Sequence, residues 1–183
     1  MRGIKIFLIL VIVSVVGASA WLLYEENVPG GLHPEMIPEI KVELGKMTKL
    51  MLSGNYDGAL AYMPKRLINK VGGKDLVGEG VVRIMAAAAD REFVIEKYEA
   101  GEPGIPQGMG SLIVSLVPIH AVIKSPLGRF HQDTFYLAIS DDGGKTWSFG
   151  SNPDQAHQWV FFDLYPELIG RFKFPEYKPL ERE

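Results

Sequence analysis

Two apolar stretches decide the fold: LIVSLVPIHAVI (residues 112–123) and FHQDTFYLAI (residues 130–139). β-Branched and aromatic residues dominate both, and only six residues separate them, so we predict two long strands of an antiparallel sheet. Shorter runs of the same character predict further strands at 93–98 and 146–149. The second half of the chain is therefore expected to form the sheet.

The chain before these strands has the periodicity of helices. Apolar residues recur at steps of three and four at Ile40, Leu44, Met47 and Met51. This spacing predicts a helix from Ile37 to the SGN sequence at 53–55, followed by a short helix that ends near Pro64 and an alanine-rich helix over 79–90. Gly72-Gly73 lies between two apolar runs and predicts a small hairpin within 66–78. Helices before antiparallel strands predict an α+β domain, with the N-terminal helices packed on a curved antiparallel sheet.

The first 24 residues have the layout of an export signal. Arg2 and Lys5 precede an uncharged apolar run from Ile6 to Tyr24. The positive end stays in the cytoplasm, so we expect the rest of the chain outside it. The run of about 19 residues is close to the roughly 20 that span a bilayer, which favours a retained membrane anchor. The small residues at 18–20 (ASA) favour the alternative, cleavage near Ala20 and secretion.

We interpret residues 25–36 as a tether and residues 37–183 as a single domain. There is no cysteine, which excludes disulfides and thiolate chemistry. The formal net charge is −3 with no block of basic residues, so a nucleic-acid partner is not expected. No His, Cys and carboxylate spacing indicates a metal site, and no phosphate loop or dinucleotide motif indicates a cofactor.

One motif stands out in the sequence SDDGGKTW at 140–147. Ser140, Asp142, Gly144, Thr146 and Trp147 match the Asp-box pattern residue by residue. Its carboxylate can accept backbone N–H groups in the turn, and its glycines can adopt positive φ. Asp boxes occur in sialidase propellers once per blade, whereas this chain has a single copy. We therefore interpret the motif as a structural turn.

The order of elements resembles the nuclear-transport-factor-2-like superfamily, a cone-shaped α+β fold. The resemblance covers about residues 37–150 and is carried by NYDGAL (55–60), LVGEGV (76–81) and the hairpin ending SDDGGKTWSF (140–149). It implies a cone that holds a small, partly apolar ligand, or a sheet that binds a protein partner or a second copy. The superfamily also contains isomerases, dehydratases and cyclases, so the fold alone does not fix the function.

Candidate site residues lie on the two long strands. His131 and Asp133 are two residues apart and so share a strand face, which the apolar residues Phe135, Leu137 and Ile139 continue. A histidine and a carboxylate at the end of an apolar face are candidates for an acid–base pair in a pocket. The alternative interpretation is a strand whose polar end leaves the core.

Tyr98 and His120 are candidates for ligand binding, and Tyr98 or Tyr136 for stabilising an oxyanion. His120 shares a face with apolar residues, where a histidine is commonly a hydrogen-bonded core residue. Two hypotheses remain from the sequence. The first is an exported, membrane-tethered binding or assembly domain that is not an enzyme and that could hold a small, partly apolar ligand. The second is a small-molecule isomerase, dehydratase or cyclase that uses His131 and Asp133.

Overall fold

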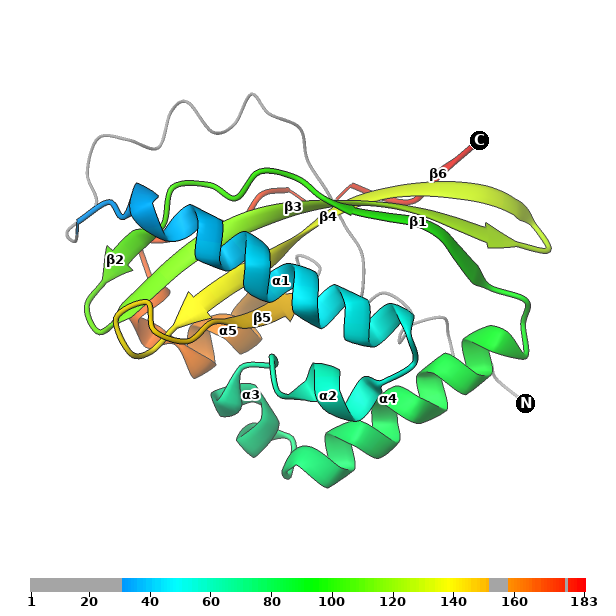
Figure 1. Cartoon of the computed structure of the whole chain (residues 1–183), viewed down its shortest axis with the longest axis horizontal. Coiled ribbons are helices and arrows are strands. Elements are labelled where there is room, and N and C mark those ends of the chain that lie inside the picture. Colours follow the sequence, from blue (N-terminus) through cyan, green and yellow to red (C-terminus); the bar gives the residue numbers. More distant parts are fainter. Residues whose placement is uncertain (1–30, 152–157, 177) are drawn as a thin grey trace.

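A computed structural model describes residues 31–151, 158–176 and 178–183 (Figure 1). The predicted export segment 1–24 and residues 25–30 of the predicted tether lie outside these ranges. In the part of the chain that is described, no helix is both long enough and apolar enough to cross a membrane. The described residues form the expected α+β fold, with helices followed by a curved antiparallel sheet.

The two stretches that decide the fold form one long hairpin at the centre of the sheet. β3 (Leu112–Ser125) and β4 (Gly128–Ser140) stay in register from the pair Ile113–Ser140 to the pair Ser125–Gly128. Four shorter strands flank this hairpin: β1 (Val94–Ala100) and β2 (Gln107–Met109) pair with β3, while β5 (Ser148–Ser151) and β6 (Glu181–Arg182) pair with β4. The predictions of strands near 93–98, 112–123, 130–139 and 146–149 are thus confirmed.

Four helices precede the sheet: α1 (Ile37–Leu52), α2 (Tyr56–Leu60), α3 (Lys65–Lys70) and α4 (Lys74–Ala89). The expected hairpin within 66–78 is wrong, because α3 and the start of α4 occupy this segment. Gly72 and Gly73 have φ angles of 104° and 106°, which residues other than glycine rarely adopt. The glycine pair turns the chain between two helices instead of two strands.

Different parts of the chain cover the two faces of the sheet. On one face, Ile40, Leu44 and Met47 of α1 pack against β3, β4 and β5. On the other face lie the C-terminal helix α5 (Gln158–Leu164) and the 3-10 turn η4 (Pro166–Leu168), with Phe174, against alternate residues of β3 and β4. Helix α1, with Ala59 of α2, therefore covers one face, and the C-terminal segment adds a second apolar core on the other.

The end of the predicted tether packs on the domain. Leu32 forms a bridge with Gln107 of β2, and the backbone N–H of His33 donates to the carbonyl of Pro106. The 3-10 turn η3 (Pro34–Met36) then leads directly into α1. Residues 31–36 thus fix the start of α1 beside the β2 edge of the sheet.

Candidate functional site

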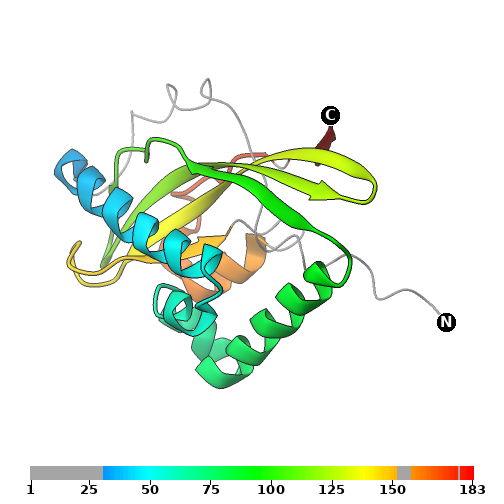
Figure 2. The same cartoon turned by 45° about the vertical axis from the view of Figure 1, so that its right-hand side comes forward.

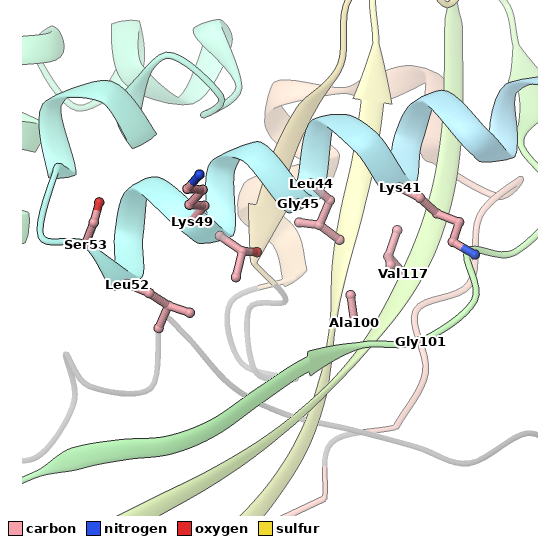
Figure 3. Close-up of a pocket in the computed structure, with 10 residues that line it drawn as sticks. Lys41, Leu44, Gly45, Lys49, Leu52, Ser53, Ala100, Gly101 and Val117 are labelled. Atoms are coloured by element: carbon pink, nitrogen blue, oxygen red, sulfur yellow. The ribbon is translucent and has the colours of Figure 1, made fainter.

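A groove of about 620 Å³ lies between α1 and the end of β1 (Figure 3). One side of α1 forms one wall, and Ala100, Gly101 and Val117 of the sheet form the other. The α1 residues that line it, with Ser53 just after the helix, are Lys41, Leu44, Gly45, Thr48, Lys49 and Leu52. Ligand sites for small molecules commonly have volumes of about 300–1,000 Å³, so this groove has the size of a binding site.

The groove has an apolar floor, an apolar side chain at one end and an ion pair at the other. Leu44 and Val117 are buried at its base, whereas the Leu52 side chain at one end is 58% exposed. At the other end the ammonium of Lys41 forms an ion pair with Glu102 at 2.8 Å. The Lys49 ammonium turns away from β1 (Figure 3). The arrangement suits a small molecule that is mostly apolar and exchanges with solvent.

Gly45 keeps one wall of the groove open. It lies in the middle of α1, where a glycine costs about 0.5–1 kcal/mol of stability relative to alanine. A Cβ atom built on Gly45 would meet no heavy atom within 4 Å, so packing within the domain does not require a glycine here. The missing side chain widens the groove between α1 and β1 and leaves the helix backbone accessible from it.

The chemistry of the groove is that of binding. None of its ten lining residues carries a carboxylate or an imidazole, the usual groups for proton transfer near neutral pH. Its hydroxyl groups are those of Thr48 and Ser53, and Ser53 donates its hydroxyl hydrogen to the carbonyl of Leu50 within α1. Among the described residues, no cluster of three or more His, Cys, Asp or Glu side chains has the arrangement of a metal site.

The sequence-predicted pair His131 and Asp133 lies on the other face of the sheet. Both residues follow the face of Phe135, which packs against the C-terminal segment and not against α1. Asp133 contacts Nδ1 of His120 across the β3–β4 pair, and the rings of His120 and His131 stack with centroids 5.8 Å apart. The side chains of His120 and Asp133 are 36% and 49% exposed. The three residues form a polar surface cluster at the end of the second core.

The predicted ligand-binding residues Tyr98 and His120 are not brought together. Tyr98 pairs with Ala121, whose side chain lies on the α1 face, whereas His120 lies on the opposite face. The Tyr98 hydroxyl is buried next to that of Tyr136, without a hydrogen bond of good geometry. Burial raises the pKa of both tyrosines, most strongly that of Tyr98, so both phenols stay protonated. They belong to the core beneath α1.

The Asp-box segment forms the turn between β4 and β5. Oδ1 of Asp142 accepts hydrogen bonds from the backbone N–H groups of Lys145 and Thr146 at 3.1 and 3.0 Å, and Oδ2 accepts the Thr146 hydroxyl at 2.7 Å. The Ser140 hydroxyl donates to Asp142 and accepts from the N–H of Gly144. These bonds lower the pKa of Asp142 to about 2. Trp147 follows the turn and is buried in the core under α1.

Sequence reasoning missed the groove, because its walls come from residues more than forty positions apart. Two local signals point to it: the Pro- and Gly-rich loop 101–110, a candidate pocket rim whose Gly101 lines the groove, and Gly45, a glycine inside an otherwise regular amphipathic helix. A strand alternation shows which residues share a face, but it does not show which face α1 will cover. The same limit applies to His120 and Asp133, whose pairing depends on the register of β3 against β4.

Comparisons with known proteins identify no relative of this chain. No protein-family model, curated protein or solved structure matches the chain. A function is therefore inferred from the residues of this chain and their geometry.

Proposed function

We propose that this chain is an exported binding domain, tethered to the membrane by residues 1–24, that holds a small and largely apolar molecule between α1 and β1. The observation that carries the proposal is the groove at Gly45, whose volume is about 620 Å³. A glycine there lowers helix stability, and no contact within the domain requires it. The missing side chain leaves one wall of the groove open to a ligand.

The lining supports a largely apolar ligand. The buried floor at Leu44 and Val117 supplies apolar contact, and each square ångström of apolar surface removed from water contributes about 25 cal/mol. Lys41 already has a carboxylate partner in Glu102. Thr48 offers a hydroxyl beside the apolar wall, so a ligand with one hydroxyl or carbonyl group fits as well as a hydrocarbon.

An enzyme of the isomerase, dehydratase or cyclase type has less support. Its candidate acid and base, His131 and Asp133, lie across the sheet from the groove. Asp133 is exposed and already contacts His120, so no apolar enclosure surrounds the pair. General acid–base chemistry needs the base within hydrogen-bond reach of a bound substrate. Because the sheet separates them, His131 and Asp133 cannot reach a substrate that is bound in the groove.

The location and the wider fold are part of the same proposal. The apolar run Ile6–Tyr24 behind Arg2 and Lys5 supports export, with the domain outside the cytoplasm. A helix-covered curved sheet supports a cone-like fold of the nuclear-transport-factor-2-like kind. A reporter that is active only outside the cytoplasm, fused after Glu183, tests export; activity of a cytoplasm-only reporter contradicts it. Mass spectrometry of the native protein distinguishes an intact anchor from a chain cut after Ala20.

The binding proposal is tested with the neutral fluorophore N-phenyl-1-naphthylamine and the full chain in a mild detergent. Gly45→Leu places an isobutyl group in the groove and should weaken probe binding at least tenfold. Gly80→Leu is the matched control, because Gly80 is also inside a 16-residue helix, and a Cβ added there would meet no heavy atom within 4 Å. We expect Gly80→Leu to bind the probe like the wild type. Equal binding by all three proteins would overturn the proposal.

A further inference from the structure

Helix α4 has no fully buried residue. None of the residues Lys74–Ala89, all of which are described, is buried, and α4 packs chiefly on α2 and α3. Figure 2 shows it extending away from α1 toward β1. Leu76 and Val82 are 53% and 55% exposed on this helix. The half-buried apolar residues of α4, such as Val77, Val81 and Ile84, lie on one side of the helix, and its opposite side has no partner in the described part of the chain.

The outer face of α4 carries a regular set of side chains. With 3.6 residues per turn, Leu76, Glu79, Arg83 and Ala86 project to the same side, and all four are exposed. Val82 lies at the border of this face. Glu79 and Arg83 carry opposite charges, and their own contact is long, at 4.0 Å, with both side chains more than 70% exposed. Both are therefore available to other partners.

This face is complementary to itself. In an antiparallel pair of α4 helices about a two-fold axis at the level of Val81, Glu79 of each chain stands opposite Arg83 of the partner subunit. Leu76 of each chain then faces Ala86 of the partner subunit, which places a large side chain against a small one. The two-fold axis forms the Glu79–Arg83 contact and the Leu76–Ala86 contact twice each, as in an isologous interface.

We propose that α4 is a dimerisation surface, and that its partner is the antiparallel α4 of a second copy of this chain. A partner of unrelated sequence is not expected to carry a matching order of charges and side-chain sizes, whereas a second copy of α4 does. The proposal is independent of the ligand groove, because α4 contributes no residue to that groove. Gly45→Leu should consequently leave the dimer unchanged.

Charge reversal tests the proposal in the full chain, solubilised in mild detergent and followed by sedimentation. Glu79→Arg alone and Arg83→Glu alone each put like charges opposite one another twice, and each should raise the dimer dissociation constant about tenfold. An equimolar mixture of the two variants should recover wild-type dimerisation, because each heterodimer restores both opposite-charge pairs. Loss of the i,i+4 pair within one helix cannot produce such recovery. Wild-type protein that stays monomeric, or single variants that dimerise like the wild type, would overturn the proposal.

A cysteine experiment locates the surface. The chain has no cysteine, so a single substitution gives the only thiol. Val82→Cys lies near the proposed axis and should form an intersubunit disulfide with copper phenanthroline as oxidant, since disulfides form when Cα atoms are about 4.4–6.8 Å apart. Val42→Cys on α1 is the matched control, because Val42 is also 55% exposed. Equal crosslinking of the two variants would contradict an interface on α4.

Discussion

The two long helices of the domain, α1 and α4, differ in what they cover. Both contain 16 residues and an apolar stripe, and α1 has one interior glycine where α4 has two. α1 buries Ile40, Leu44 and Met47 against the sheet, whereas α4 buries no residue at all. One helix thus completes the core, and the other presents its surface to solvent.

Amphipathic periodicity therefore defines the apolar face of a helix but not the surface on which that face packs. The half-buried positions of α4 include Val77, Val81 and Ile84, which follow the helical period as regularly as the buried positions of α1. What separates the two helices is position in the fold: α1 lies across β3 and β4, and α4 lies beyond α2 and α3. The stability of the domain should accordingly depend on α1 much more than on α4.

The largest expected effect is on the core face of α1. Leu44→Ala should lower the free energy of unfolding by about 2–5 kcal/mol, because it leaves a cavity at a fully buried site. Leu76→Ala on α4 is the matched change and should stay within about 0.5 kcal/mol, since Leu76 is half exposed. Urea unfolding at a concentration where the chain is monomeric measures both. If Leu76→Ala lowered the free energy of unfolding as much as Leu44→Ala does, α4 would contribute to the core as α1 does, contrary to this prediction.

A smaller effect is expected where the Asp-box turn supports the start of α1. Gly144 of that turn lies so close to Met36 that a Cβ would approach the Met36 side chain to 2.6 Å, and Trp147 is part of the core beneath α1. Asp142→Ala should cost about 1–2 kcal/mol, as for other lost side-chain hydrogen bonds to backbone N–H groups. Urea unfolding should show this loss, and binding in the groove should persist in the folded protein. Unchanged stability together with lost binding would make the turn part of a site.

The contribution of the Asp142 carboxylate to stability should decrease as the pH is lowered. The pKa of Asp142 is lowered from 3.8 to about 2 in the folded chain, so folding favours its ionised form. Its contribution is therefore present above about pH 4 and is lost as the pH falls toward 2. Because the carboxylate is largely exposed, water screens part of the effect. The difference in unfolding free energy between the wild type and Asp142→Ala should narrow over this range; a constant difference would contradict the ionic role.

The sequence predicted the sheet and α1 well because their signals are local. A stretch so rich in β-branched and other apolar side chains as residues 112–123 can form little else than a buried strand, and the three- and four-residue steps from Ile40 define α1. The error at Gly72-Gly73 has a physical origin: positive φ serves a helix–helix turn as readily as a hairpin. The docking of α5 on the second face was also not predicted, although Phe161 and Tyr165 showed a helical period.

The candidate site was less predictable because it depends on contacts between distant residues. Alternation placed His131 and Asp133 on one face, but only the packing of α1 decides which face holds the groove. Gly45 and Ala100 meet across the groove because the sheet returns β1 beneath α1. No pattern within either segment contains that information, so helix and strand periods alone could not have located it.

The smallest expected effect compares the glycines of the two helices. Gly45→Ala and Gly80→Ala should each raise the free energy of unfolding by about 0.5–1 kcal/mol, because both sites have open space for a methyl group and alanine favours a helix. Thermal unfolding measures the gain. Only Gly45→Ala adds atoms to the groove, so it alone should weaken binding of N-phenyl-1-naphthylamine. Equal stabilisation with unequal binding would show that the glycine in α1 serves the groove; a loss of stability at Gly45 would mean that the helix itself needs the glycine.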